Sequence, residues 1–367
     1  MHPELLYQIA LTQVTNIGCV HAKILIDHFG NAEAIFKARK STLENMEGIG
    51  SIRASAIKSF TDFSRAEEEL KFITKYKIQP LFIGTKPYPR RLLNCYDSPT
   101  MLYYRGEADL NSSRVVSIIG TRANTDYGKL LTEKLVKELA AEKILILSGL
   151  AFGIDTMAHK SALKNGLPTV GVLAHGLDTI YPAENTRLAK QMVTEGGGIL
   201  SEFMSGTKPD KHNFPTRNRI VAGMADATIV IETDIKGGSM ITAELANNYN
   251  RDVFAFPGKT TDAKSKGCNY LIRANKAALI TSAQDLLELM GWLPQPEKKK
   301  KVQRELFIEL TADERILVQL LGQNDQMQID EIYLQSQLTA SLTAAALLSL
   351  ELQGIVVSLP GKVYKLV

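Results

Sequence analysis

The sequence predicts an α/β fold: a Rossmann-like, doubly wound parallel sheet, preceded by a helical domain and followed by a winged-helix domain. Three observations predict it. Short apolar runs alternate with amphipathic stretches in the middle of the chain, glycine-punctuated helical patterns precede them, and helical patterns ending in two strand-like runs follow them. The expected domains are residues 1–75, 76–292 and 306–367, with a basic linker at 293–305.

The sheet is predicted from seven short apolar runs between residues 114 and 291. Each is rich in Val, Ile, Leu or Phe, and helical stretches such as DYGKLLTEKLVKELAAE separate them. This alternation is typical of parallel strands that are buried on both faces and covered by helices. The runs are VVSIIG, ILILSG, PTVGVLAHG, GGILSEF, ATIVIET, DVFAFPG and AALIT.

The N-terminal segment contains two glycine turns between helical patterns. Gly18 begins the first turn, and Gly48 and Gly50 form the second, which leads into a helix with Ala54 and Ile57 on its inner face. The pattern resembles a tandem helix-hairpin-helix module, in which backbone N–H groups at the hairpin hold a phosphate. A plain helical bundle with tight turns explains the same residues, and the two interpretations stay open.

The C-terminal segment has the pattern of three helices and two strands. Thr311 and Glu314 have the spacing of a capping box, and Pro360 marks the turn between the strand-like runs IVVSL and KVYKLV. The helix expected at Thr339 to Gln353 contains no Lys or Arg, although base-reading helices normally carry such donors. We expect this domain to contact protein, or nothing specific.

Composition restricts the class of protein. The chain has 367 residues, 45% of them hydrophobic and 22% charged, with a net charge of +4, as expected of a globular protein in several domains. Its cysteines, Cys19, Cys95 and Cys268, are odd in number and lack CxxC spacing, which favours reduced thiols over disulfides or zinc. The N-terminus lacks the pattern of a signal peptide, and no apolar run approaches a membrane span. We therefore expect a cytoplasmic protein without membrane contact.

Glycines and polar side chains follow four of the predicted strands. The carboxyl ends of parallel strands meet at one edge of the sheet, where ligands bind. Glycine admits close backbone approach, serine hydroxyls and helix N-terminal amides donate to phosphate oxygens, and basic side chains supply charge. The expected polyanion cradle consists of Gly120, Thr121, Arg122, Ser148, Gly149, Gly237, Gly238, Ser239 and Lys259.

The same loops lack the pattern of an enzyme site. No GxGxxG follows the first strand and no GxxxxGK[ST] occurs, so neither a dinucleotide cofactor nor an NTP-hydrolysing loop is indicated. His159, His175 and His212 share no spacing with a cysteine or with paired carboxylates, and we interpret them as packing or surface residues. We therefore expect binding without catalysis, with no cofactor and no metal.

The segment FPTRNRIVAGMA contains the least expected charges. If Pro215 begins a helix, Arg217 shares one face with Ile220, Val221 and Met224, so its guanidinium requires an anionic partner.

Two partners for Arg217 stay open: a bound phosphate, or a carboxylate from Glu202 or Glu232. Arg219 lies on the opposite face and is the more exposed of the two arginines. Phe152 and Phe214, on the predicted loops, offer rings on which unpaired bases could stack.

Seven segments, in order, are similar to the DNA-processing protein A (DprA/Smf) family. They are SIIGTRANTDYG, LSGLAFGIDTMAH, GLDTIYPAENTRLA, GGGILSEF, FPTRNRIVAG, GGSMITAELA and FPGKTTDAKSKGCNYLI. The resemblance implies a protein that binds single-stranded DNA without catalysis, loads RecA recombinase onto incoming DNA in natural transformation, and forms a homodimer through the Rossmann-like domain.

The resemblance also assigns residues. Arg122 matches the family's DNA-backbone contact. The other matching positions, by segment, are Ser148 and Gly149, then Phe214, Arg217, Asn218 and Arg219, then Gly237, Gly238 and Ser239.

Three positions depart from the family pattern. Thr121 stands where Ser is more frequent, which keeps the hydroxyl. Phe152 stands where many members have Lys or Arg, so a phosphate contact there is in doubt, and His175 replaces a small residue.

Two other classes of function remain. GGSMITAE shares two glycines and a glutamate, Glu244, with the catalytic turn of nucleotide phosphoribohydrolases, but Met240 and Ile241 replace that turn's glycine and threonine. A protein scaffold that acts through residues 306–367 is the third class.

Overall fold

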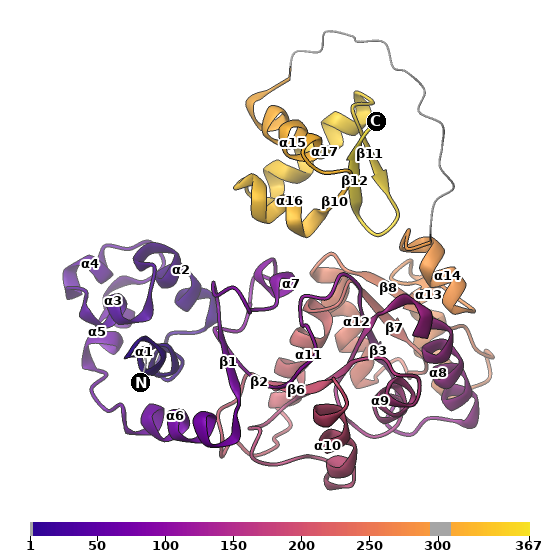
Figure 1. Ribbon diagram of the computed structural model, residues 1–367, viewed down its shortest axis with the longest axis horizontal. Coiled ribbons are helices and arrows are strands. Elements are labelled where there is room, and N and C mark those ends of the chain that lie inside the picture. Colours follow the sequence, from indigo (N-terminus) through magenta and orange to yellow (C-terminus); the bar gives the residue numbers. More distant parts are fainter. Residues whose placement is uncertain (1–2, 294–309) are drawn as a thin grey trace. The chain divides into compact units, whose positions relative to one another are not determined.

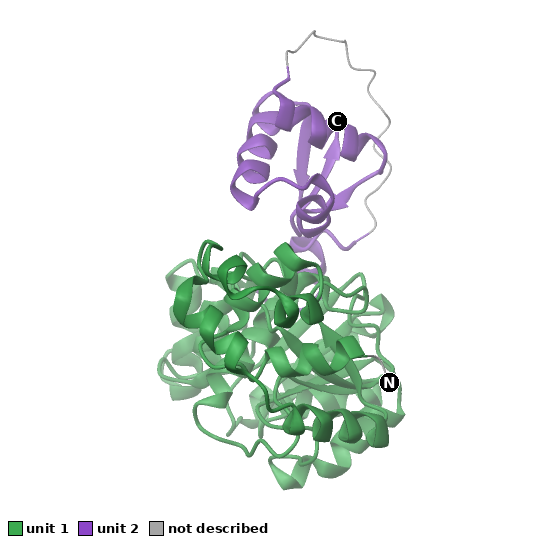
Figure 2. Ribbon diagram, turned by 90° about the vertical axis from the view of Figure 1, so that its left-hand side faces the viewer, with its two compact units in different colours: residues 1–279 green, residues 280–367 purple. Residues whose placement is uncertain are grey.

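The computed structural model describes residues 3–293 and 310–367, which form two compact units, residues 1–279 and 280–367 (Figure 2). Apart from residue 293, the predicted linker lies outside the described residues. The finer division of the chain into domains stays a prediction. Within the described ranges, no helix combines the length and the apolar character needed to cross a membrane.

The first unit contains a nine-stranded sheet with the order β1-β2-β6-β5-β4-β3-β7-β8-β9 (Figure 1). In this order, each strand from β6 through β5, β4, β3, β7 and β8 to β9 pairs in parallel with its neighbour. Their runs of Val, Ile and Leu are mostly fully buried, which confirms the predicted doubly wound sheet. These strands are β3 (Val115–Ile119), β4 (Leu145–Ser148), β5 (Thr169–Leu173), β6 (Gly198–Ser201), β7 (Ala227–Val230), β8 (Asp252–Ala255) and β9 (Ala278–Leu279).

Two further strands, which were not predicted, extend the sheet beyond β6: the first of them along the sheet pairs antiparallel with β6, and the second pairs antiparallel with the first. They are β1 (Gln79–Phe82) and β2 (Met101–Gly106), with the four-residue helix α7 (Arg90–Leu93) between them. β1 lies at the edge, where its proline, Pro80, is tolerated because proline has no N–H to donate and an edge strand pairs on one side only. Such a short run containing a proline does not resemble a core strand in the sequence.

Helices cover the sheet between successive strands. α9 packs against α8 and α10, whereas α11 packs against α12. Strand order reverses between β3 and β7, so their carboxyl ends form the crevice where ligands bind in folds of this kind. The helices are α8 (Asp126–Glu138), α9 (Ile154–Lys164), α10 (Thr186–Thr194), α11 (Asn213–Gly223), α12 (Gly238–Asn248) and α13 (Lys266–Arg273).

Six helices precede the sheet and confirm the predicted helical segment. Ala54 and Ile57 are buried, as expected, and Gly48 and Gly50 have φ angles of 80° and 67°, a left-handed conformation that favours glycine. Phosphate binding at this glycine turn stays a prediction. The helices are α1 (Pro3–Leu11), α2 (Cys19–Phe29), α3 (Ala32–Lys37), α4 (Lys40–Glu44), α5 (Gly50–Ser59) and α6 (Ser64–Tyr76).

The second unit contains the predicted winged helix. The capping box of Thr311 and Glu314 is present, with both hydrogen bonds formed. A short strand, β10, joins the two predicted strands in a sheet of order β10-β12-β11. The elements are α14 (Ala283–Leu289), α15 (Ala312–Gly322), β10 (Met327–Gln328), α16 (Ile329–Ser336), α17 (Ala340–Leu352), β11 (Val356–Leu359) and β12 (Val363–Leu366).

His159 gives the fold a testable pH dependence. It is fully buried on α9, and its Nδ1 lies 2.7 Å from the Thr169 hydroxyl, which itself donates to the Ile146 carbonyl at 3.0 Å. Nδ1–H therefore donates to Thr169. Burial, with a smaller contribution from the charge of Arg217, lowers the pKa of His159 from 6.5 to about 3.

Because the unfolded chain binds this proton and the folded protein does not, the histidine's contribution to stability is lost as pH falls from about 6.5 toward 3. The limiting slope is about 1.4 kcal/mol per pH unit. We expect urea unfolding of His159→Phe to depend less steeply on pH in this window than that of the wild type. The exposed His212 provides the control, His212→Phe, and equal slopes for wild type and His159→Phe would contradict the assignment.

Candidate nucleic-acid interface

A pocket of about 590 Å³ lies at the carboxyl edge of the sheet. Its walls come from the turns after β3, β4 and β7, from the starts of α9 and α12, from α11, and from the 3-10 turn Ala263–Ser265. Two acidic residues, Asp155 and Asp234, line it, but the basic side chains outnumber them. The basic lining residues are Arg122, Lys211, Arg217, Lys236 and Lys264.

The N-terminus of α12 opens at this pocket. Gly237 is the N-cap residue, and Gly238 and Ser239 begin the helix within the pocket lining. The Ser239 hydroxyl donates to Thr233 Oγ1 at 2.7 Å. The first amides of a helix and its dipole favour an anion at this end. The predicted glycine and serine turn is therefore placed where an anion binds best.

Arg122 is one of the exposed cations that line the pocket. Its guanidinium carbon lies 5.1 Å from the ring centroid of Phe214, and the Phe214 ring lies 6.1 Å from that of Tyr181. The ring attracts the guanidinium electrostatically and so holds the positive charge beside an aromatic face. The arrangement provides a phosphate partner and a stacking surface side by side.

Arg217 lies beneath the pocket with its side chain buried, as its position on the apolar stripe predicts. Its Nη1 donates to the carbonyls of Gly149 and Val172, the latter at 2.6 Å. Burial lowers the pKa of Arg217 to about 10, while the nearby Asp155 opposes the shift. The helix itself begins at Asn213, so Pro215 occupies its first turn rather than its first position.

The two carboxylates expected as alternative partners of Arg217 are engaged elsewhere. Glu202 forms an ion pair with Arg219, and Glu232 accepts the Thr125 amide at 2.9 Å and the Thr125 hydroxyl at 2.5 Å. The alternative prediction, that Glu202 or Glu232 pairs with Arg217, is wrong. Arg219 also donates to the Asp97 carbonyl, and it is not one of the residues that line the pocket.

Asp155 is the carboxylate whose charge interacts with that of Arg217. It is buried in the first turn of α9 and accepts the Ala151 amide at 3.3 Å. Burial raises its pKa, and the charge of Arg217 opposes the shift. Its charge partly compensates the buried guanidinium, so the positive excess of the pocket comes from its other cations.

The structure brings most of the predicted binding residues together. Asn218, which follows Arg217 on α11, lines the pocket with them, and their contact with DNA stays a prediction. The predicted residues in the lining are Gly120, Thr121, Arg122, Gly149, Phe214, Arg217, Asn218, Gly237, Gly238 and Ser239.

Four predicted residues lie outside the pocket lining: Ser148, Phe152, Arg219 and Lys259. Ser148 is fully buried at the end of β4 and donates to the Ile118 carbonyl at 2.6 Å, because the last strand residue points into the sheet packing. Lys259 is exposed after β8, away from the lining, and Arg219 pairs with Glu202.

Phe152 and His175 line a second, smaller hollow that shares Arg122, Phe214 and Arg217 with the main pocket. Phe152 is 43% exposed, whereas His175 is buried. His175 Nδ1 lies 2.9 Å from the Gly176 carbonyl, and burial lowers the pKa of this histidine. The histidine therefore forms part of the hollow's interior, and Phe152 provides an aromatic wall.

Sequence reasoning missed three basic residues of the lining: Lys211, Lys236 and Lys264. Lys236 directly precedes the glycine pair, and Lys211 lies three residues before Phe214. Lysines flanking the predicted turns were therefore a usable signal. Lys264 lies in a 3-10 turn (Ala263–Ser265) that no sequence pattern singled out.

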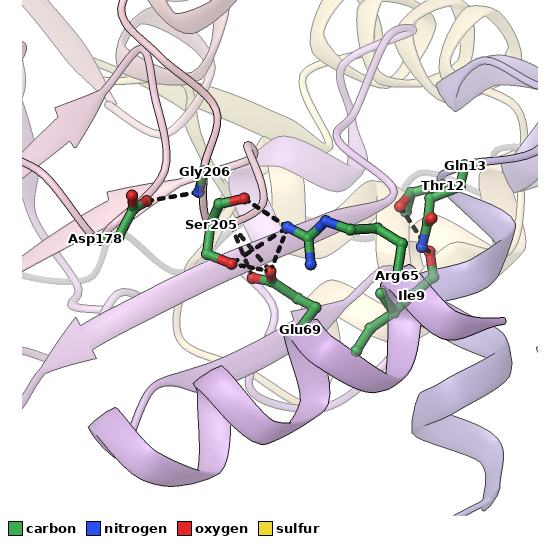
Figure 3. Close-up of polar contacts among 8 residues, drawn as sticks. All are labelled: Ile9, Thr12, Gln13, Arg65, Glu69, Asp178, Ser205 and Gly206. Atoms are coloured by element: carbon green, nitrogen blue, oxygen red, sulfur yellow. Dashed lines mark hydrogen bonds and ion pairs between the residues drawn. The ribbon is translucent and has the colours of Figure 1, made fainter.

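The loop beside the pocket is fixed to the N-terminal helices by a buried carboxylate (Figure 3). Glu69 on α6 accepts the Ser205 amide at 3.0 Å and the Ser205 hydroxyl at 2.5 Å. Arg65 bridges the two, donating to Glu69 at 2.9 Å and to the Ser205 carbonyl at 2.5 Å. Asp178 accepts the Gly206 amide at 2.9 Å, so this loop is held from two sides before it leads into α11.

Glu244, the acid of the rival enzyme hypothesis, lies outside the pocket lining. It forms an ion pair of 2.6 Å with Lys276. The residue that a phosphoribohydrolase would need is therefore directed to another contact.

The chain matches known protein families and relatives in sequence. The DNA recombination-mediator protein A family matches residues 79–291, and the DprA winged helix domain matches residues 306–362. Protein Smf of Synechocystis sp. is 34% identical over 397 residues, which covers 99% of this chain and 98% of the relative. The chain belongs to the DprA family. DNA processing protein DprA of Streptococcus pneumoniae is 44% identical over 54% of this chain and 70% of its own length.

Solved DprA structures have the same fold. DNA processing protein A from Streptococcus pneumoniae superimposes with a TM-score of 0.64 at 33% identity, over 77% of this chain and 95% of that one. The protein from Helicobacter pylori gives a TM-score of 0.52 at 33% identity, over 57% of this chain and 94% of that one. The Helicobacter pylori work describes a single-stranded DNA binding mode of that DprA.

Gly149 provides a test of how the buried arginine is held. A Cβ on Gly149 would overlap the guanidinium of Arg217, whereas a Cβ on Gly238 meets nothing within 4 Å. We expect Gly149→Ala to lower the free energy of unfolding by about 1–3 kcal/mol, the usual cost of overpacking. Gly238→Ala, in the first turn of α12, should be neutral or stabilising, by up to about 1 kcal/mol. Equal urea midpoints for the two variants would contradict the packing.

Proposed function

We propose that this protein is a single-stranded DNA-binding recombination mediator that loads RecA recombinase onto incoming DNA during natural transformation. The observation that carries the proposal is the pocket in which five basic residues face two acidic ones beside a helix N-terminus. The name of the family, DNA recombination-mediator protein A, supports DNA as the polyanion. Its expected compartment, the cytoplasm, follows from that role.

The chemistry of the pocket favours an unpaired strand over duplex DNA. Phosphates bind to Arg122, Lys211 and Lys236, while the rings of Phe214 and Tyr181 accept a base face. Bases in a duplex are stacked on one another and do not present that face. Affinity is then nearly independent of sequence and falls steeply with salt.

Arg122 is the side chain whose loss tests the DNA proposal. Arg122→Ala should weaken binding of oligo-dT and of mixed sequences alike, by about tenfold or more, since hydrogen bonds to charged groups contribute about 1.5–3 kcal/mol. The measurement is fluorescence anisotropy at two salt concentrations.

Arg105→Ala removes an exposed arginine on β2, outside the pocket, and serves as the matched control. If Arg122→Ala binds as tightly as this control, Arg122 does not contact DNA. If the wild type shows no micromolar binding at low salt, the DNA proposal itself fails.

RecA and a second copy of the chain are the proposed protein partners. The test is RecA's DNA-dependent ATPase on single strands already covered by a single-strand binding protein. We expect the wild type to shorten the lag before ATPase activity, and Arg122→Ala to shorten it less, because loading requires a grip on the strand. A lag unchanged by the wild type would refute loading while leaving DNA binding intact. Sedimentation of the wild type at micromolar concentration tests the homodimer.

A further inference from the structure

A second basic surface lies outside the pocket, in a groove of about 660 Å³ between α8 and α9. The two helices pack side by side (Figure 1). Five lysines and one glutamate contribute to the lining, and all five lysines are exposed. These charged residues are Lys129, Lys134, Lys137, Lys160, Lys164 and Glu133.

Most of this charge is not compensated locally. Lys134 lies 3.7 Å from Glu138, an exposed pair that contributes little, and Glu133 is the acidic residue in the lining. The lysines of two helices thus concentrate positive charge in a concave surface, which raises the local concentration of a polyanion.

The N-terminal ends of α8 and α9 connect the groove with the pocket along the chain. On α9, Asp155 lines the pocket and Met157, two residues later, lines the groove. On the other side, the turn that carries Arg122 leads directly into α8, whose Lys129 lies in the groove. A strand that leaves the pocket past Arg122 therefore meets this groove next.

We propose that the α8–α9 groove is a second contact for the same single strand of DNA, continuing its path beyond the pocket. This rests on the proposed function. From Lys129 to Lys137 the groove extends ~12 Å along α8, or about three phosphates at the ~3.4 Å rise of a helical strand. Leu130, 63% exposed, adds apolar surface between the lysines, which suits unpaired bases and their sugars better than duplex DNA.

A second copy of this chain is the less favourable occupant. In a two-fold symmetric contact the same surface faces itself, so the lysines of one groove would approach the lysines of the other. Such repulsion opposes dimerisation but has no effect on binding of a polyanion.

The test removes three groove lysines, Lys137→Gln, Lys160→Gln and Lys164→Gln together. Glutamine removes the charge but keeps a flexible polar side chain and a similar helix propensity, so the fold is retained. The control removes three exposed lysines outside both surfaces: Lys71→Gln, Lys86→Gln and Lys190→Gln. Binding is measured with oligo-dT of about 6 nucleotides, sized for the pocket, and of about 20 nucleotides, sized to reach the groove.

We expect the groove variant to bind the short oligonucleotide like the control and the long one more weakly. Its salt slope for the long oligonucleotide should fall by about 2, at ~0.7 per lost phosphate contact. The ratio of the wild-type affinity to that of the groove variant then rises about 100-fold for each tenfold decrease in salt concentration.

Equal affinity and equal slope for the groove and control variants with the long oligonucleotide would overturn the groove. A changed sedimentation coefficient with unchanged long-strand affinity would overturn it too, in favour of a protein interface. If Arg122→Ala leaves the affinity for both oligonucleotides unchanged, the pocket proposal fails instead, so the two failures are distinguishable.

Discussion

The buried guanidinium of Arg217 fixes the geometry on which the pocket depends. It binds the carbonyls of Gly149 and Val172, which belong to the ends of two neighbouring strands, and so joins α11 to the carboxyl edge of the sheet. A buried charge is stable only if its hydrogen-bond partners are in place, so the position of each element constrains the others. Gly149 must lack a side chain because the guanidinium occupies that space.

This constraint separates the charges of the site into two layers. The inner layer is internally compensated: Asp155 faces Arg217, and Glu202 pairs with Arg219. The outer layer keeps an excess of positive charge: Arg122 stacks on an aromatic ring, and three lysines line the same pocket with one further carboxylate, Asp234. Arg217 and Arg219 therefore stabilise the packing around the pocket, and the exposed cations remain available for a ligand. The FPTRNR segment supplies both the frame residue and, through Phe214, the stacking surface.

Much of the fold and part of the site could be predicted from the sequence, for physical reasons. Buried parallel strands require apolar runs with glycine turns, and strand ends converge by topology, which predicted Arg122 and the turn at Gly237. The direction of single side chains could not be predicted in this way. Ser148 points into the sheet because it is still a strand residue, and Arg219 pairs with Glu202 because tertiary packing brings distant segments together. Strand β1 was missed because its proline obscures the pattern.

The composition of the lining also determines what kind of recognition is possible. Distinguishing bases requires side chains that meet base edges in pairs, such as a carboxamide against adenine or a fork of donors against guanine. Within the lining that the structure describes, Asn218 is the one carboxamide, Arg217 is occupied by backbone carbonyls, and Arg122 lies against Phe214. Lysines and helix amides bind phosphates, which are the same in every sequence. Such a lining suits a ligand that is recognised by its phosphates rather than by its bases.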